Sequence, residues 1–155
     1  MIKLICSDVD GTLVPDGTRD INPEIFDVIC RLKEQGIHFA IASGRPISSI
    51  RSLFRPIEDK LFFIAVGGSE IATKSRVLFH WDMDRGDIEA MIRDGRRIPG
   101  CEILMNGITA SYLETKDREF YNWLTDGYGT ETTMADDLLT VDDNIIALSF
   151  YHRGH

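Results

Sequence analysis

The chain has 155 residues, a length that suits one domain or a small domain with an insertion. Its 25 acidic and 17 basic residues give a formal net charge of −8, and no basic cluster is present, which argues against a nucleic-acid partner. No apolar run approaches the roughly 20 residues of a membrane span, and no signal peptide precedes the first strand. Of the three cysteines, Cys6 and Cys30 lie among apolar residues and are expected to be reduced core thiols. We therefore expect a cytoplasmic globular protein without membrane contact.

The N-terminal stretch Lys3–Val14, KLICSDVDGTLV, predicts a short buried strand that ends at two carboxylates. Asp8 and Asp10 stand where this strand opens into a turn at Gly11. Because burying an unpaired carboxylate is costly, the pair is expected to bind a metal ion or another compensating charge. A Mg²⁺ ion together with a bound phosphate would suit it. The alternative is an acidic β-turn, since Asp-Gly is a common turn pair.

A helix and a second strand follow the first motif. Residues 15–20 are turn formers, and Asn22 can cap a helix that ends at Gly36. Residues 37–42, IHFAIA, predict a second buried strand. Strand, helix and strand in this order form a βαβ unit, so the two strands are expected to be parallel.

A possible anion site comes directly after the second strand. Ser43, Gly44, Arg45 and Pro46 end that strand and open a helix that extends to about Phe54. A hydroxyl, a glycine and a helix N-terminus in succession can bind an anion, although Ser43 alone could also be a simple N-cap. Because it follows a parallel strand, Ser43 is expected at the same end of the sheet as the two carboxylates. Arg45 is expected either to contact a substrate or to pair with an acidic side chain.

The third strand is predicted at residues 61–66, and Gly67–Gly68 then turns the chain. Residues 71–72 and 77–79 flank a polar turn and predict a β-hairpin. From Asp82 onward the pattern changes to helix, strand, strand, helix, strand.

The second half of the chain has two predicted helices. Asp84 or Asp87 could cap the first, which extends to about Arg96, and the second occupies residues 117–124. Their inward-facing residues are expected to be Ile88, Met91, Ile92, Phe120, Trp123 and Leu124.

The strands of this half are predicted at residues 101–105 and 108–113, around a hairpin turn at Asn106–Gly107. A weaker strand is predicted at residues 138–141 and a stronger one at residues 145–151.

The segment DVDGTLV resembles the first motif of the haloacid dehalogenase superfamily, DxDGT followed by apolar residues, and ASGRP resembles its second motif. The resemblance implies that Asp8 is a nucleophile that forms an aspartyl-phosphate. It implies that Asp10 protonates the leaving group and then activates water. The implied cofactor is Mg²⁺, with Asp8 and Asp10 as its metal ligands. The resemblance gives phosphate contacts to Val9, Gly11, Ser43 and Gly44, and a substrate contact to Arg45.

The order of elements looks like the Cof-type, sugar-phosphatase-like branch of this superfamily, in which an α/β cap is inserted after the third core strand. The implied fold is α/β: the first half of a Rossmann-like parallel core sheet in residues 1–81, and a partial α/β cap in residues 82–155. Such caps close over the site, exclude water and select the substrate. The implied activity is Mg²⁺-dependent hydrolysis of the phosphomonoester of a small metabolite, such as a sugar phosphate. Where that branch usually has Asn-Gly, this sequence has Gly67–Gly68.

Two motifs of the family are not found: the lysine of the third and the acidic GDxxND cluster of the fourth. Both follow the cap in the family, so the chain is expected to stop within the cap. The strand at Leu4–Cys6 would then lie at the edge of the sheet and could pair with a second copy, which would give a homo-oligomer. A phosphotransferase or mutase on the same scaffold and a non-catalytic fragment remain alternatives to a phosphatase.

Overall fold

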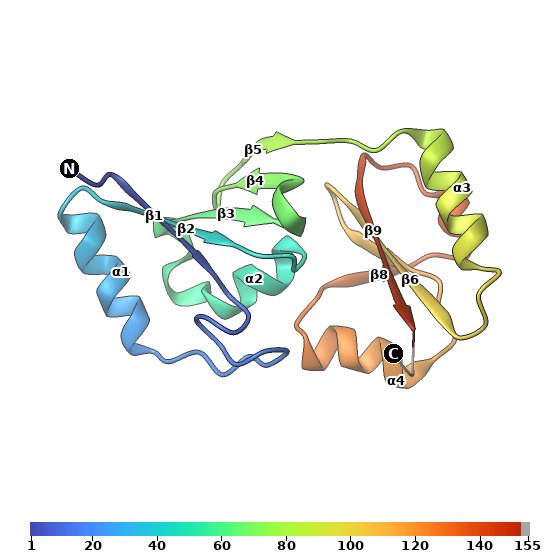
Figure 1. Ribbon diagram of the computed structural model, residues 1–155, viewed down its shortest axis with the longest axis horizontal. Helices are drawn as coiled ribbons and strands as arrows, with labels where there is room; N and C mark the ends of the chain where they lie inside the picture. Colours follow the sequence, from blue (N-terminus) through green and yellow to red (C-terminus); the bar gives the residue numbers. More distant parts are fainter. Residues whose placement is uncertain (153–155) are drawn as a thin grey trace.

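The computed structural model describes residues 1–152 and arranges them around two β-sheets that lie side by side (Figure 1). The first sheet has five strands in the order β1-β2-β3-β4-β5, and the second has four in the order β8-β7-β6-β9. Within residues 1–152, no helix combines the length and apolar character that a membrane crossing requires. The expected α/β architecture, with parallel strands in the first sheet, is confirmed.

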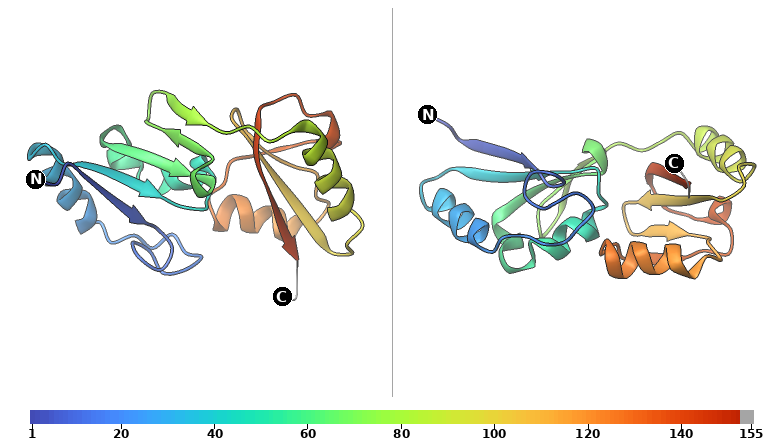
Figure 2. Two further views of the ribbon diagram at one scale, coloured as in Figure 1. Left: turned by 45° about the horizontal axis from the view of Figure 1, so that its top comes forward. Right: turned by 60° about the horizontal axis from the view of Figure 1, so that its bottom comes forward.

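The first sheet joins a parallel half to an antiparallel hairpin. Strands β1, β2 and β3 are parallel, as the βαβ pattern predicts, and β4 and β5 form the predicted hairpin. Helices α1 and α2 lie on the same face of this sheet (Figure 2). A 3₁₀ segment joins α2 to β3, and another joins β3 to β4. The elements are β1 (Leu4–Asp8), α1 (Glu24–Glu34), β2 (His38–Ala42), α2 (Ile47–Leu53), η1 (Arg55–Lys60), β3 (Leu61–Ala65), η2 (Val66–Gly68), β4 (Glu70–Ala72) and β5 (Val77–His80).

The core of this half lies between the sheet and its two helices. Ile29 of α1, Ile41 of β2, Ile50 of α2 and Phe63 of β3 are fully buried in one cluster. Asn22 accepts a hydrogen bond from the Glu24 amide at 3.0 Å, which confirms the expected cap at the start of α1. Apolar periodicity in the sequence therefore places the sheet and helices correctly.

Strand β1 is not the fully buried strand that its apolar sequence predicts. It occupies one edge of the sheet, where Leu4 is 54% exposed and Cys6 is exposed. The prediction that Cys6 is a core thiol is therefore wrong. An edge strand has a neighbour on one side only, and α1 and α2 cover only one face of this sheet.

The second sheet is covered on both faces. Ile103 and Met105 of β6 pack with α3, whereas Leu104, which points to the opposite face, packs with α4. Asp84 caps α3 and Asp117 caps α4 through their side chains. The elements are α3 (Arg85–Gly95), β6 (Cys101–Gly107), β7 (Ser111–Leu113), α4 (Arg118–Asn122), the π-helical turn η3 (Trp123–Gly127), β8 (Thr132–Met134), the 3₁₀ turn η4 (Leu138–Thr140) and β9 (Ile145–His152).

Four details of this half differ from the sequence prediction. The hairpin turn is not at Asn106–Gly107, because both residues belong to β6 and the Gly107 amide donates to Ala110 at 2.9 Å. Residues 138–141 do not form a strand, whereas Thr132–Met134 form one that was not predicted. Met91 and Trp123 do not face inward, since 38% and 44% of their surfaces are exposed.

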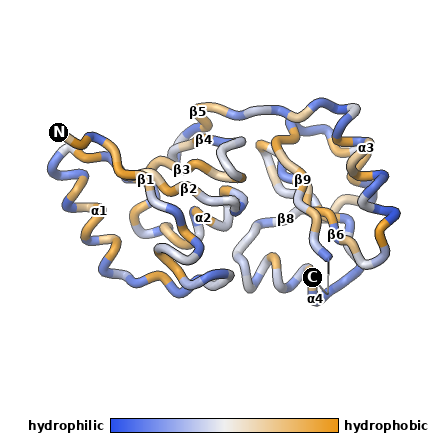
Figure 3. Tube along the Cα trace, viewed as in Figure 1, coloured by the Kyte–Doolittle hydropathy of each residue, from blue (hydrophilic) through white to orange (hydrophobic). Residues whose placement is uncertain are grey.

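The chain passes from the first sheet to the second at residues 81–84, a hydrophilic connection beside the more hydrophobic strands (Figure 3). Hydrogen bonds also join the two parts away from this connection. The Ser49 hydroxyl of α2 donates to the Tyr128 carbonyl at 2.6 Å, and the Glu131 amide donates to the Ser48 hydroxyl at 3.1 Å. The predicted boundary at residue 81 lies in this connection, but the division into two domains stays a prediction.

Candidate active site

Asp8 and Ser43 come together at the carboxyl ends of two neighbouring parallel strands. Asp8 is the last residue of β1 and pairs in register with Ala42, the last residue of β2, which Ser43 follows directly. The Asp8 side chain lies at an exposed position, whereas Ser43 is only 6% exposed. The crevice outside the carboxyl ends of parallel strands is where α/β folds bind ligands.

Hydrogen bonds hold Ser43 in place. Its amide donates to the Ile64 carbonyl at 2.9 Å, and its carbonyl accepts from the Gly67 amide at 3.1 Å. Its hydroxyl accepts from the Arg45 amide at 3.1 Å. Because α2 begins only at Ile47, Ser43 is not the N-cap of that helix, and its hydroxyl instead fixes the loop that leads into it.

The turn after β1 places Asp10 in the site. The Val9 carbonyl accepts hydrogen bonds from the amides of Thr12, Leu13 and Val14 at 2.8 to 3.2 Å, which closes a tight turn. Gly11 has a φ of +74° in this turn, a backbone conformation that favours glycine. Val9 itself is fully buried, so its side chain anchors the turn in the core.

Arg45 forms an ion pair with Asp10. Its Nε donates to Asp10 Oδ2 at 2.9 Å, and its Nη2 donates to Asp10 Oδ1 at 2.5 Å and to the Thr18 carbonyl at 2.8 Å. The Arg45 side chain is fully buried, and that of Asp10 is 29% exposed. The hydrogen bonds from Arg45 hold the pKa of Asp10 below its ordinary value, so the carboxylate is the favoured form. Of the two expectations for Arg45, the structure shows the pairing with an acidic side chain.

Tyr128 completes this cluster from the second half of the chain. The Arg45 guanidinium carbon lies over the Tyr128 ring, 4.1 Å from its centroid. Tyr128 was not predicted as a site residue, because this contact joins segments that are distant in sequence and belongs to no local motif.

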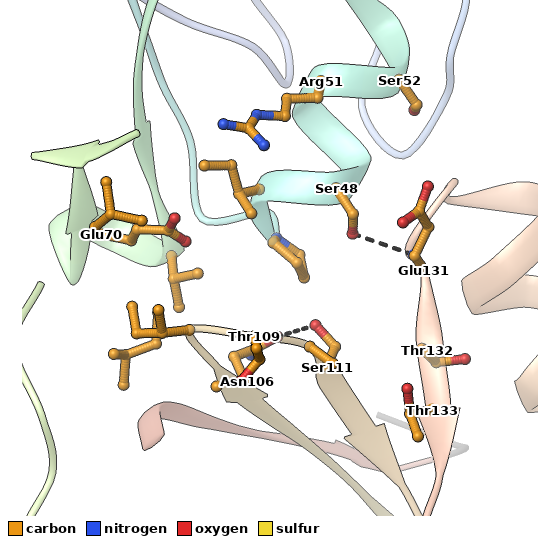
Figure 4. A pocket seen from close by; sticks show the side chains of 18 of the residues that line it. Ser48, Arg51, Ser52, Glu70, Asn106, Thr109, Ser111, Glu131, Thr132 and Thr133 are labelled. Atoms are coloured by element: carbon orange, nitrogen blue, oxygen red, sulfur yellow. Dashed lines mark hydrogen bonds between the residues drawn. The ribbon is translucent and has the colours of Figure 1, made fainter. Parts of the chain in front are cut away.

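A polar cavity of about 550 Å³ lies between α2 and the second sheet (Figure 4). Arg51 and Ser48 of α2 line one wall, and Asn106 and Ser111 of the second sheet line the opposite wall. Glu70 of β4 also lines it, and its carboxylate points into the space between the walls.

Two buried polar groups characterise this cavity. Asn106 is 3% exposed, and its side-chain oxygen accepts from the Ser111 hydroxyl at 2.9 Å. Glu70 is also 3% exposed, and burial raises the pKa of its carboxyl group, although Arg51 and His80 oppose this shift. The volume is in the range of small-molecule sites, about 300–1,000 Å³. Pro46, which follows Arg45 in the sequence, lines the cavity, whereas Asp10 and Arg45 themselves do not.

A family model described as haloacid dehalogenase-like hydrolase matches residues 5–153. The chain belongs to this family. The DVDGTLV and ASGRP segments, which suggested it, lie within the matched range and meet at one end of the first sheet.

Relatives of known name and structure agree with this assignment. The chain is 26% identical over 115 residues to a 5-amino-6-(5-phospho-D-ribitylamino)uracil phosphatase of Escherichia coli. The matched segment covers 74% of this chain and 42% of that protein. A crystal structure of a protein from Eubacterium rectale superposes with a TM-score of 0.79 and 36% identity, over 98% of this chain and 58% of that one.

A subclass IIB sugar phosphatase of the same superfamily shares the fold, with a TM-score of 0.72 at 18% identity, over 96% of this chain and 58% of that one. The chain thus spans less than two thirds of the length of each of these three proteins.

Proposed function

We propose that this protein is a Mg²⁺-dependent phosphatase that hydrolyses the phosphomonoester of a small metabolite through an aspartyl-phosphate at Asp8. The observation that carries the proposal is the exposed Asp8 carboxylate beside Ser43, at the ends of two adjacent parallel strands. The phosphatase of Escherichia coli to which the chain is similar supports the same reaction class.

In the first proposed step, an Asp8 oxygen bonds to phosphorus as the bond from phosphorus to the substrate oxygen breaks. Asp10 in its protonated form supplies the proton that the leaving oxygen needs and becomes a carboxylate. In the second step, water attacks the phosphorus of the aspartyl-phosphate as the bond from phosphorus to the Asp8 oxygen breaks. The Asp10 carboxylate takes a proton from this water, which restores its protonated form. Arg45 favours the ionised form of Asp10, which is the form that accepts this proton.

Ser43 and nearby amides are proposed to bind the phosphoryl group. The Ser43 hydroxyl accepts a hydrogen bond from the Arg45 amide, and it can at the same time donate to a phosphoryl oxygen. The amides of Val9 and Gly44 lie in the two loops that follow β1 and β2, where the sequence motifs predict phosphate contacts. The Gly11 amide, also predicted to contact phosphate, instead donates to the Val14 carbonyl at 2.8 Å.

The oxygen donors of the site suit a hard divalent cation. No group of three or more His, Cys, Asp or Glu side chains is placed to hold a metal within residues 1–152. Mg²⁺, however, commonly binds one or two carboxylates, keeps several waters and uses substrate phosphate as a ligand. We propose that the Asp8 carboxylate and the Asp10 carbonyl hold it, because Arg45 occupies both oxygens of the Asp10 side chain. When bound, the ion neutralises charge between Asp8 and the phosphate.

The polar cavity beside α2 is proposed to accommodate the leaving group. Its buried amide, hydroxyl and carboxyl groups would hydrogen-bond a small hydroxyl-bearing or amide-bearing compound better than an apolar one. An Asn106→Ala variant should then raise KM for such a natural substrate while leaving hydrolysis of a generic aryl phosphate unchanged. An equal effect on both substrates would contradict this part of the proposal.

The decisive experiment measures phosphate release from p-nitrophenyl phosphate with and without Mg²⁺, for the wild type, Asp8→Asn and Asp16→Asn. Asp16 is an exposed aspartate of the same loop and serves as the matched control. We expect Mg²⁺-dependent release by the wild type and Asp16→Asn, and none by Asp8→Asn. Transfer of phosphate to an added sugar would instead identify a phosphotransferase, and a wild type without activity would favour a non-catalytic role.

A further inference from the structure

We propose that Tyr128 is a positioning residue that acts through Arg45 to hold the Asp10 carboxylate in one orientation. The proposal rests on the role of Asp10 given above and adds a residue from the second half of the chain to the site. It follows from three linked contacts: Asp10 with Arg45, Arg45 with Tyr128, and Tyr128 with its own neighbours.

The first contact fixes Asp10. Two of the hydrogen bonds to its carboxylate come from Arg45, and a third comes from the Gly17 amide at 3.3 Å. Because the guanidinium group is planar, its Nε and Nη2 engage both oxygens in one defined geometry. The orientation of Asp10 therefore depends on the rotamer of Arg45.

The second contact fixes Arg45. Its side chain is fully buried, and its Nη1 has no hydrogen-bond partner among residues 1–152. A buried cation whose donors are incompletely paired needs another source of stabilisation, and the face of an aromatic ring provides it. Tyr128 supplies this face at 4.1 Å from its ring centroid to the guanidinium carbon.

The third set of contacts fixes Tyr128. Its carbonyl accepts the Ser49 hydroxyl at 2.6 Å, which ties it to α2. Its ring stacks on Trp123, with centroids 5.4 Å apart and an interplanar angle of 24°. Trp123 in turn stacks on Phe120, which belongs to the core under the second sheet. A continuous row of ring contacts therefore connects the second half of the chain to Asp10.

This arrangement makes the orientation of Asp10 depend on the contacts between the second half of the chain and α2. With the Tyr128 ring removed, Arg45 would lose the surface that covers its guanidinium and could take other rotamers. Asp10 would then keep only the hydrogen bond from Gly17 for part of the time. The rate of proton transfer should fall, whereas phosphate binding at Ser43 should not change.

The test compares Tyr128→Leu with Tyr128→Phe, which keeps the ring, and with Tyr121→Leu. Tyr121 is a control on α4 that packs against the core under the second sheet and belongs to none of the ring contacts that lead to Arg45. Hydrogen exchange at the Arg45 Nε–H, followed by NMR and assigned with Arg45→Lys, reports the contact without requiring activity. We expect exchange in Tyr128→Leu to accelerate at least about tenfold, the scale of one desolvated cation–π contact, and Tyr128→Phe to remain near the wild type. If the Arg45 Nε–H exchanged in Tyr128→Leu at the same rate as in the wild type, the proposal would be overturned.

Kinetics provides the second measurement. For Asp8-dependent hydrolysis of p-nitrophenyl phosphate, Tyr128→Leu should lower kcat with KM unchanged, and both Tyr128→Phe and Tyr121→Leu should retain the wild-type kcat. A rise of KM alone, or an equal loss in Tyr121→Leu, would contradict a positioning role. If the wild type shows no Asp8-dependent hydrolysis, the proposed function fails, and the exchange measurement still decides whether Tyr128 holds Arg45.

Discussion

The Arg45 guanidinium donates to both carboxylate oxygens of Asp10, at 2.9 Å from Nε to Oδ2 and at 2.5 Å from Nη2 to Oδ1. The two residues follow different strands of the first sheet, so the pair links the loop after β1 to the loop after β2. Each loop carries one of the two family motifs that this sequence contains. The geometry of the pair therefore connects the proposed acid–base residue to the proposed phosphate-binding loop.

Replacing Arg45 by lysine should reduce hydrolysis although the positive charge is kept. A lysine ammonium is a point charge on a flexible stem and cannot engage both oxygens of Asp10 in the planar geometry of arginine. We expect kcat for p-nitrophenyl phosphate to fall roughly 10- to 100-fold, a part of what a well-placed acid–base group contributes. Arg31→Lys, at an exposed position of α1, is the control and should leave kcat unchanged. A wild-type kcat in Arg45→Lys would show that hydrogen bonds from one guanidinium group to both oxygens of Asp10 are not needed.

Acid should destabilise the second half of the chain by protonating the two carboxylates that form ion pairs with Arg96. Arg96 donates to Glu114 at 2.6 and 2.8 Å and to Asp137 at 2.5 Å. These hydrogen bonds from Arg96 lower the pKa of Glu114 and of Asp137 in the folded state. Because the folded pKa lies below the unfolded one, the stabilisation is fully present above the ordinary carboxyl pKa, about 4, and is lost as the pH falls through the folded pKa.

Urea unfolding between pH 7 and pH 2.5 measures this effect. The wild type should lose stability below about pH 4, and Arg96→Gln, which removes the charge, should lose less over the same range. Arg97→Gln is the matched control, because Arg97 pairs only locally with Asp94 on an exposed surface. An identical pH dependence in Arg96→Gln and the wild type would show that the cluster does not contribute.

Local patterns in the sequence predicted the first half of the fold well. The alternation of apolar strands and an amphipathic helix gave the parallel order of β1 and β2, and this order alone brings Asp8 and Ser43 to one end of the sheet. The DxDGT pattern also predicted the turn at Gly11, since φ there is positive. These features depend on neighbouring residues, so a sequence can show them directly.

Features that depend on distant segments were not predictable in this way. The exposure of Cys6 follows from the position of β1 at an edge. The apolar sequence of the strand does not reveal this position, which was predicted only from the two family motifs that are not found. The Asn106–Gly107 pair has a strong turn propensity, yet a buried hydrogen bond between Asn106 and Ser111 keeps it within the strand pair. Tyr128 reaches Arg45 only because α2 and the second half of the chain meet.

Residue 129 lies close to side chains of the first half of the chain, in a backbone conformation that favours glycine. Gly129 has a φ of +72°, and a Cβ there would lie 2.9 Å from Arg19 Cζ and from Ser52 Oγ. Gly36 is the matched control, because it has a φ of +75° with nothing within 4 Å of a built Cβ. Gly36→Ala should cost about 1–2 kcal/mol through backbone strain alone.

Gly129→Ala should lose more stability than Gly36→Ala, because it adds a steric clash to the same strain. Urea unfolding of both variants isolates the difference. We also expect Gly129→Ala to weaken the contact between Tyr128 and Arg45 by moving the neighbouring residue. Equal losses in the two variants would mean that the segment around Gly129 can move away from Arg19 without cost.

Strand β1 should mediate self-association of this chain. It pairs with β2 on one side, and no strand among residues 1–152 pairs with its other side. Ile2 and Leu4 on or beside this edge are 65% and 54% exposed. An unpaired edge with exposed apolar side chains is a template for pairing with a second copy, and a charged residue on such an edge opposes it.

Light scattering coupled to size-exclusion chromatography should therefore show a concentration-dependent increase in mass for the wild type, and Leu4→Lys should reduce it. Leu78→Lys is the matched control, since Leu78 is 41% exposed on β5, at the opposite edge of the same sheet. Leu78→Lys should leave the association unchanged, because β5 lies away from β1. Strand β5 is also shorter than β1 and pairs with its neighbour in the antiparallel direction. If Leu78→Lys disrupts association and Leu4→Lys does not, the copies pair through β5, and the exposed apolar residues of β1 need another explanation.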